Sequence, residues 1–264
     1  MRSPLVLVTG SAGRIGQAVV AELAAHRRPV RGFDRVATAG IKDFVVGVLT
    51  DPESVKRAMQ GVGTLVHLAA TPDDADFLTE LLPNNIVGVY HVFEAAQQAG
   101  VGRMILASSG QVVWGRRLTG PWPVGTEVQP TPRYWYAACK MFLEAAGRAF
   151  ADTHGIEVIA VRLGWCPRTK EQVAEIAEQE WAQDVYLSPR DAGRFFACAV
   201  EAPAKISFAV VYATSKPIHI LRYDLQTTKD LLGYEPAESW PQGIEVVTGK
   251  ASERRKECLP GLMD

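Results

Sequence analysis

Cysteines are few and scattered in this sequence. The four are Cys139, Cys166, Cys198 and Cys258, too few and too widely spaced for a disulfide scaffold. No pair of them has the short spacing of metal ligands, so no metal site is expected. We interpret all four as reduced thiols, which is typical of a cytoplasmic protein.

Long apolar runs and an excess of charge are also missing. No uninterrupted apolar stretch reaches the ~18 residues of a transmembrane helix. The run at Leu5–Val8 is too short for the core of a signal peptide. Lys and Arg number 28 against 29 Asp and Glu, which gives a net charge of −1. Such a chain has no general attraction to nucleic acid or to an anionic membrane, and we expect neither as a partner.

Short apolar runs alternate with stretches of helical periodicity along this chain of 264 residues, 47% of them hydrophobic. The runs predict strands at 5–8, 29–33, 44–49, 64–68, 103–107, 157–162 and 206–213. The periodic stretches predict helices from 15 onward and at 51–59, 85–99, 135–151, 170–182 and 191–200. Strands that alternate with helices form βαβ units. We therefore predict a doubly wound α/β fold with a parallel sheet and helices on both faces.

A glycine-rich loop joins the first expected strand to the first expected helix. Gly10 permits a tight turn, Gly13 lets the backbone approach a pyrophosphate, and Gly16 lets the helix pack closely on the strand. Arg14 and Ile15 open the helix, whose free N–H groups favour phosphate. A glycine turn without a ligand is the alternative. The order strand, loop, helix and acidic residue favours a dinucleotide site of the Rossmann type.

The acidic residue is Asp34, at the end of the second expected strand. A carboxylate at this position accepts hydrogen bonds from both adenosine ribose hydroxyls and repels a 2′-phosphate, which favours NAD over NADP. Arg35 and Arg14 lie nearby in sequence and are able to bind a phosphate, so NADP stays the less favoured alternative. A solvated strand end is the other interpretation of Asp34.

Tyr136 and Lys140 are four residues apart in an expected helix, so they lie on one face of it. A phenol with a pKa near 10 is a poor base at neutral pH. A neighbouring ammonium favours the phenolate, which then takes a proton from a substrate alcohol. Such a pair is common on ordinary helix surfaces. Its place after a strand that ends in Ser108-Ser109, in a chain that opens with a dinucleotide loop, favours a catalytic role.

Together these motifs resemble a known family. The resemblance is carried by Thr9-Gly10-x-x-Gly13-x-x-Gly16, Asp34, His67-Leu68-Ala69-Ala70, Asn85-x-x-Gly88, Ser108-Ser109 and Tyr136-x-x-x-Lys140. Their order is similar to that of the extended short-chain dehydrogenases/reductases, the NAD-dependent epimerase/dehydratase group. The resemblance covers residues 4–165 well and the remainder loosely. Within the group the short length and the Val161-Arg162-Leu163-Gly164 stretch look most like the uronate dehydrogenases.

The resemblance implies a role for each matching residue. Tyr136 would be the general acid/base, Lys140 would tune it and bind the nicotinamide ribose, and Ser109 would hydrogen-bond the reacting oxygen. Asn85 would support the active-site backbone, or simply cap a helix, and His67 is better interpreted as a satisfied strand histidine. The expected cofactor-binding residues are Gly10, Gly13, Arg14, Ile15, Gly16, Asp34, Arg35, Leu49, Leu68, Ala69, Ala70, Asn85, Tyr136 and Lys140.

Three departures from the family pattern concern the ligands. Gly110 stands where many relatives have a hydroxyl residue, which leaves Ser109 or Gln111 to orient the substrate. Val48 replaces the usual adenine-binding aspartate, and Trp165 replaces a small polar residue of the uronate enzymes. For a sugar acid, a cation should clamp the carboxylate, and Arg168, Arg190 and Arg194 are candidates. The expected substrate-binding residues are Thr71, Ser109, Gly110, Gln111, Trp165 and Arg168, and Trp114 is a further candidate for the lining of the pocket.

We expect a single domain over 1–264, with a dinucleotide-binding Rossmann core at 1–163. Residues 164–264 would be a small substrate-binding elaboration that completes the fold, which favours a small substrate. The leading hypothesis is an NAD-dependent dehydrogenase of a small sugar, sugar acid or polyol. The alternatives are a sugar or nucleotide-sugar epimerase or dehydratase that recycles its cofactor, and a non-catalytic NAD(P)-sensing protein.

The resemblance also implies a homodimer, since relatives often pair through helices equivalent to 85–99 and 135–151. Apolar side chains on the outer face of these helices would be needed. Val89, Val92, Phe93, Met141 and Phe142 are the candidates, and core packing explains them equally well.

Overall fold

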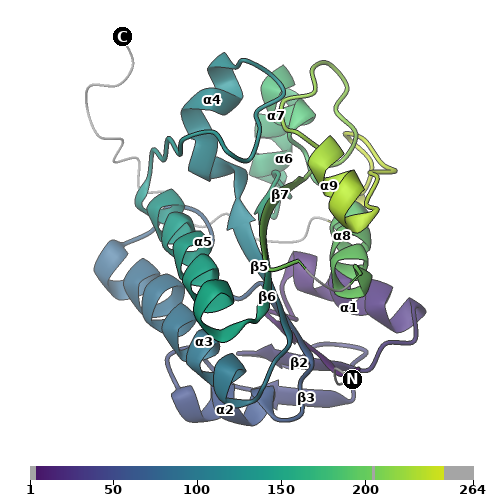
Figure 1. The fold of residues 1–264 in the computed structure, drawn as a ribbon. Helices are drawn as coiled ribbons and strands as arrows, with labels where there is room; N and C mark the ends of the chain where they lie inside the picture. The colour runs from purple at the N-terminus through teal and green to yellow at the C-terminus, as the bar shows by residue number, and fades with distance from the viewer. Residues whose placement is uncertain (1–3, 204–205, 247–264) are drawn as a thin grey trace.

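A seven-stranded parallel sheet in the order β3-β2-β1-β4-β5-β6-β7 forms the centre of the molecule (Figure 1). The computed structural model describes residues 4–203 and 206–246. The strands are β1 (Val6–Thr9), β2 (Val30–Asp34), β3 (Asp43–Val46), β4 (Thr64–His67), β5 (Arg103–Ser109), β6 (Glu157–Leu163) and β7 (Phe208–Ala213). From β1 the chain adds β2 and β3 on one side of the sheet, and it then adds β4 to β7 on the other side. The gap between β1 and β4 is therefore the topological switch point, where such sheets bind ligands.

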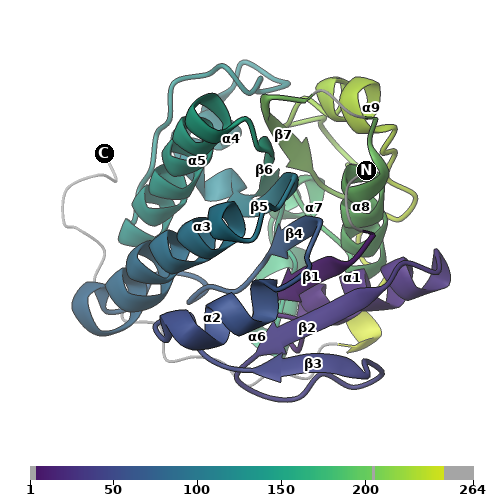
Figure 2. The ribbon, with the colours of Figure 1, turned by 60° about the horizontal axis from the view of Figure 1, so that its bottom comes forward.

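Helices cover both faces of the sheet (Figure 2). On one face lie α2 (Pro52–Met59), α3 (Gly88–Gln98) and α5 (Trp135–His154), and on the other α1 (Arg14–Ala25) and α8 (Pro189–Glu201). The shorter elements are the π-helix η1 (Phe77–Val87), the 3₁₀ turns η2 (Gly110–Val113) and η3 (Ile244–Val246), and the helices α4 (Trp114–Thr119), α6 (Lys170–Ala177), α7 (Glu180–Asp184) and α9 (Gln226–Leu232). No helix within the described ranges is long and apolar enough to cross a bilayer.

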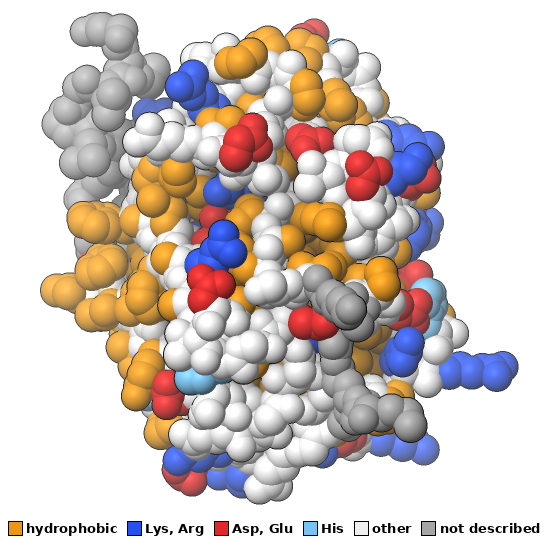
Figure 3. Space-filling view, in the orientation of Figure 1, with side chains coloured by type: hydrophobic (Ala, Val, Ile, Leu, Met, Phe, Trp, Pro, Cys, Tyr) orange, Lys and Arg blue, Asp and Glu red, His pale blue; other side chains and the backbone are white. Residues whose placement is uncertain are grey.

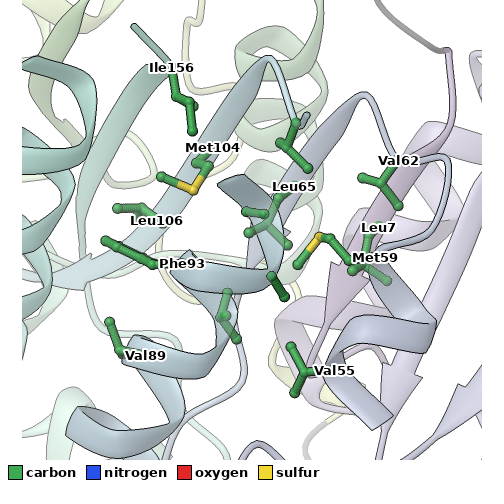
Figure 4. Packing of buried hydrophobic residues seen from close by; sticks show 14 of the residues in the cluster. Leu7, Val55, Met59, Val62, Leu65, Val89, Phe93, Met104, Leu106 and Ile156 are labelled. Carbon is green, nitrogen blue, oxygen red and sulfur yellow. The ribbon is translucent and has the colours of Figure 1, made fainter. Parts of the chain in front are cut away.

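Each face of the sheet has its own apolar core because successive side chains of a strand point to opposite faces. Leu7 and Leu65 pack with Phe93 of α3 beneath the first face, as Figure 4 shows. Val8 packs with Phe196 of α8 on the other face. Both cores are fully buried, which explains why the strands read as continuous apolar runs.

The predicted strands are confirmed, with boundaries that shift by a few residues. The predicted helix at 51–59 is confirmed as α2, and Asp51 is its N-cap. Asp51 Oδ1 accepts a hydrogen bond from the Glu53 N–H at 3.1 Å, and Pro52 occupies the first helical position.

Two helix predictions were wrong in their limits. The helix predicted at 85–99 begins only at Gly88, because η1 precedes it with Pro83 inside and the Gly88 N–H bonds to the Pro83 carbonyl. Proline lacks an N–H donor, and the wider turn accommodates it. The helix predicted at 170–182 is two helices, α6 and α7. Gln179 has extended backbone between them and accepts a hydrogen bond from Trp181 Nε1 at 2.6 Å.

Core packing, the other interpretation of the five apolar candidates, applies to three of them. Val89, Val92 and Phe93 lie in the core, with at most 3% of their surface exposed. Met141 is partly buried against the cluster around Val112, and Phe142 remains 39% exposed. The α3 residues face the sheet because the helix turns its most apolar stripe inward.

Candidate active site

One cavity of about 960 Å³ lies at the carboxyl ends of the strands. It is lined by the ends of β1, β2, β4 and β5 and by the segment that follows β6. Of the predicted site residues, the lining contains Gly10, Gly13, Arg14, Ile15, Gly16, Asp34, Arg35, Leu49, Leu68, Ala69, Ala70, Thr71, Ser109, Gln111, Tyr136, Lys140, Trp165 and Arg168. Asn85 and Gly110 are not part of it.

The loop at one end of the cavity requires glycine. Gly10 has φ +71°, and a Cβ there would lie 2.8 Å from the Ala69 nitrogen. A Cβ on Gly16 would lie 2.1 Å from the Gly10 carbonyl oxygen. The helix α1 begins directly after Gly13 without a side-chain cap, so its first N–H groups are left for a ligand. A loop of this shape at a helix N-terminus fits a pyrophosphate.

Asp34 lies at the end of β2 and lines the same cavity. Its carboxylate accepts hydrogen bonds from the Ala12 N–H at 3.0 Å and from the Arg35 N–H at 2.7 Å. These bonds orient the carboxylate beside the glycine loop, where the ribose of a dinucleotide would lie. The loop and the carboxylate together therefore fit NAD. Within the described ranges no group of His, Cys, Asp and Glu side chains could hold a metal ion.

The backbone after β4 is held by buried polar side chains. Thr9 Oγ1 accepts hydrogen bonds from the N–H groups of Leu68 and Ala69 at 3.2 and 3.3 Å and contacts His67 Nδ1 at 2.8 Å. Because the hydroxyl accepts from two amides, its proton is directed to Nδ1, which makes His67 a neutral acceptor. Asn85 holds the next turn, where its amide accepts from the Thr71 N–H at 2.8 Å and donates to the Thr71 carbonyl at 2.9 Å.

Tyr136, Lys140 and Glu144 follow one face of α5 at intervals of four residues. Lys140 is 6% exposed, its Nζ donates to the Ala107 carbonyl at 2.8 Å, and burial lowers its pKa to about 8. The Lys140 nitrogen is 5.5 Å from the centre of the Tyr136 ring. Because a pKa of about 8 lies above neutral pH, Lys140 is still mostly an ammonium there.

Burial of its hydroxyl raises the pKa of Tyr136 well above the ordinary value. The charge of Asp73 raises it further, while Arg168 and a hydrogen bond with Ser109 act in the opposite direction. In the protein alone Tyr136 is thus a phenol at neutral pH, because burial outweighs the effect that was expected from the Lys140 ammonium.

Arg168 lines the cavity, but its guanidinium is engaged. Its Nη2 is paired with the Asp73 carboxylate, which also accepts from Gln172 Nε2 at 3.1 Å. The other two arginines expected to clamp a carboxylate lie outside the cavity lining. Arg190 is paired with Glu238 at 3.1 Å, and Arg194 is paired with Asp191.

Gly110 was predicted to contact substrate, and the structure places it elsewhere. A Cβ there would lie 2.4 Å from Tyr223 Oη, so the glycine makes room for a tyrosine. Its neighbour Ser109 faces the cavity, and Ser109 Oγ accepts from the Gln111 N–H at 3.1 Å.

Sequence reasoning missed several residues of the cavity. Arg117 and Trp181 line it, and so does Trp114, which was expected only on thin grounds. Arg117 follows Arg116 in a short polar stretch, a pattern that normally indicates solvated charge. Trp181 lies beyond residue 165, in the part of the chain that the family resemblance covers only loosely. Neither carries a sequence signal that would have revealed its position.

Known proteins resemble this chain in sequence and in fold. Residues 6–165 match the profile of the NAD dependent epimerase/dehydratase family. The chain is 31% identical to an NAD-dependent glucose-6-phosphate dehydrogenase of Haloferax volcanii, with 89% of this chain and 93% of that protein covered. It is 30% identical to an L-arabinose 1-dehydrogenase (NAD(P)(+)) of the same organism, over 91% of this chain and 99% of that one. A crystal structure of glucuronic acid dehydrogenase from Chromohalobacter salexigens has a TM-score of 0.74 at 26% identity, over 96% of this chain and 92% of that one.

The neutral His67 predicts an acid sensitivity. Burial first, and then the Lys140 charge, lower the pKa of His67 to about 3, whereas the pKa in an unfolded chain is ~6.5. Between these values the unfolded chain binds a proton that the folded chain does not. The free energy of unfolding therefore falls as the pH drops below 6.5, by up to about 1.4 kcal/mol per pH unit from this group.

We expect His67→Asn, which keeps an acceptor for Thr9, to reduce this loss between pH 6.5 and 5. Urea titrations at pH 7, 6 and 5 measure the effect. His219→Asn, at an exposed histidine, is the control and should leave the wild-type dependence in place. Equal pH dependence of wild type and His67→Asn would contradict the assignment.

Proposed function

Since the chain belongs to the NAD dependent epimerase/dehydratase family, we propose that it is an NAD-dependent dehydrogenase of a small sugar, sugar acid or polyol. The relatives named above are dehydrogenases of a sugar phosphate, a sugar and a sugar acid, and the names of the first two include NAD or NAD(P). The observation that carries the proposal is that Ser109, Tyr136 and Lys140 line the same cavity as the glycine loop and Asp34. A hydroxyl, a phenol and an ammonium beside a dinucleotide site are the groups needed to move a proton from an alcohol as it is oxidised.

The glycine loop, Asp34 and Lys140 would hold NAD, whose chemistry is to accept a hydride from the substrate carbon. Tyr136 Oη takes the proton of the substrate hydroxyl, and Ser109 Oγ orients the same oxygen. Lys140 contributes a positive charge that is fixed in place by the Ala107 carbonyl. Thr9 and Asn85 position the backbone after β4 and act through it.

A small substrate is supported by the walls of the cavity. Three indoles, of Trp114, Trp165 and Trp181, line it, and Trp165 stacks on Trp181 with ring centres 5.9 Å apart. The cavity has to accommodate NAD as well as substrate within about 960 Å³. We propose that residues 4–163 hold the dinucleotide within one domain and that 164–203 and 206–246 close the substrate end. The predicted ranges 1–163 and 164–264 also include residues 1–3, 204–205 and 247–264, which lie outside the described part of the chain. The free thiols of Cys139, Cys166 and Cys198 support a cytoplasmic location.

Two other functions give different outcomes in one assay. Uronates, aldoses and polyols are offered with NAD, and NADH and product are both measured. Net NADH formation supports the dehydrogenase. Product without NADH would indicate an epimerase or dehydratase, and tight NAD binding without turnover of any alcohol would indicate a sensing protein.

Tyr136→Phe is expected to lower kcat/KM for oxidation by about 1,000-fold, because the proton acceptor is lost. Oxidation by the wild type should accelerate as the pH rises from 7 to 9, because the raised pKa of Tyr136 keeps the phenolate scarce at neutral pH. Steady-state rates across this range, with NADH binding measured separately, test both points. Tyr90→Phe, at a tyrosine 58% exposed, is the control. Unchanged turnover in Tyr136→Phe would refute the role.

Asp34→Asn is expected to weaken NAD binding by about 10-fold, because a neutral amide is a poorer acceptor for ribose hydroxyls. NADP binding should not weaken, since the carboxylate no longer repels its phosphate. Fluorescence titrations with NADH and NADPH measure the ratio, and Asp43→Asn on the neighbouring strand is the control. A ratio that stays at the wild-type value would contradict the assignment of Asp34.

We also propose a homodimer formed through η1, α3 and α5. Leu78, Tyr90, Trp135 and Phe142 are exposed on these elements, and Figure 3 shows hydrophobic side chains gathered on that side of the molecule. Light scattering should give about twice 28.7 kDa for the wild type. Tyr90→Glu with Phe142→Glu should give a monomer, whereas Ile218→Glu, at another exposed apolar residue, should not. A monomeric wild type would refute the dimer.

A further inference from the structure

Three hydrogen-bond donors without a partner lie together in the wall of the cavity. Arg117 is 4% exposed, and neither its Nε nor its Nη2 has an acceptor among the described residues. The indole Nε1 of Trp114 is in the same condition. The guanidinium carbon is 3.9 Å from the centre of the Trp114 ring, and both residues line the cavity. Buried donors are normally satisfied, so this group of three lacks an acceptor.

The two free nitrogens of Arg117 form one edge of the guanidinium. That edge matches two oxygens of a carboxylate or a phosphate with parallel hydrogen bonds. The same protein uses it elsewhere, since Arg162 Nε and Nη2 bind the two oxygens of Glu144, each at 3.0 Å. Arg117 presents the same edge, but no carboxylate within residues 4–203 and 206–246 binds it.

The surroundings hold this cation without neutralising it. Trp114 and Trp181 contact the guanidinium, with distances of 3.9 and 4.4 Å from its carbon to the ring centres. Tyr223 hydrogen-bonds it, and burial lowers its pKa below the ordinary value. Two other cations lie near this group: Arg222 is paired with Asp184 at 3.0 Å, and the guanidinium carbon of Arg133 is 5.8 Å from the centre of the Trp114 ring.

The backbone at Arg117 is fixed as well. Its carbonyl accepts hydrogen bonds from Arg222 Nη1 and Trp122 Nε1, both at 3.1 Å. A side chain that served only to pack would not need a charge, since burying an unpaired cation is costly. The position, the free edge and the aromatic contacts are those of a preorganised anion site.

We propose that Arg117, with Trp114 Nε1, binds an anionic group of the substrate, a carboxylate or a phosphate. The inference rests on the proposed function and narrows the substrate to sugar acids or sugar phosphates over neutral sugars. The anion replaces a costly unpaired charge with two charge-assisted hydrogen bonds in a water-poor site.

Substrates that differ at a single carbon test the inference. Glucuronate, glucose 6-phosphate and glucose carry a carboxylate, a phosphate and a neutral hydroxyl at that carbon. The wild type should oxidise at least one of the two anionic sugars with a kcat/KM at least 100-fold above that for glucose, and the preferred one identifies the group. A wild type that oxidises glucose as well as either anion overturns the inference while leaving the proposed dehydrogenase intact.

Arg117→Met should lower kcat/KM for the preferred anion by at least 100-fold, mainly through KM, and change that for glucose less than 3-fold. Arg117→Lys keeps the charge without the edge and should lose about 10-fold. Arg116→Met, one residue away and exposed, removes the same charge and should change nothing. Arg168→Met tests the competing cation. Loss of the preference in Arg168→Met but not in Arg117→Met would overturn the assignment.

Binding separates the two proposals if no sugar is oxidised. Calorimetric titration of glucuronate and of glucose 6-phosphate into the NADH-loaded protein needs no turnover. Binding to wild type that is lost in Arg117→Met supports the anion site, whereas equal binding, or none, overturns it. Circular dichroism and NADH titration verify that the variant folds, and where Arg117→Met does not fold, Arg117→Lys and the wild-type preference decide.

Discussion

The buried ion pair of Glu144 and Arg162 joins the helix α5 to the sheet. Arg162 Nε and Nη2 donate to the two carboxylate oxygens at 3.0 Å, and Ser108 Oγ donates to Oε1 at 2.5 Å. Such a pair adds little to net stability, yet breaking it leaves a buried charge without compensation. Its consequence is geometric: the residues one and two turns before Glu144 are Lys140 and Tyr136, and the pair sets their depth in the cavity.

The cavity places unlike electrostatic environments side by side. At the end lined by the glycine loop, backbone N–H groups and one carboxylate, that of Asp34, border the cavity. Near Tyr136 the paired charges of Asp73 and Arg168 act on the phenol in opposite directions. At the far wall, Arg117 lies among indoles with its charge unpaired. Burial strengthens each of these effects, because the low dielectric of the interior screens charge poorly.

Local patterns predicted the fold, and most of the site residues that they predicted line the cavity. The parallel strands could be inferred from the alternation of apolar runs and helices, and their carboxyl ends necessarily meet at one edge. Gly10, Asp34 and Ser109 each end or follow such a strand, so their positions in the sequence predicted that they lie together at this edge. Chain geometry also explains the errors. Pro83 and Gln179 alter helices whose apolar periodicity continues, and Gly110 faces Tyr223, a contact across 113 positions.

The sequence by itself determined the sheet, the dinucleotide loop and the Tyr136–Lys140 spacing, because each depends on interactions between residues close together in the chain. Only the tertiary structure decided which charges are paired. Arg168 and Arg117 look alike in sequence, yet one meets Asp73 and the other meets Trp114 of its own helix and Trp181 of a distant segment. Which charges pair depends on their distance in space and on the exclusion of water around them. Neither can be inferred from residues that are close together in the sequence.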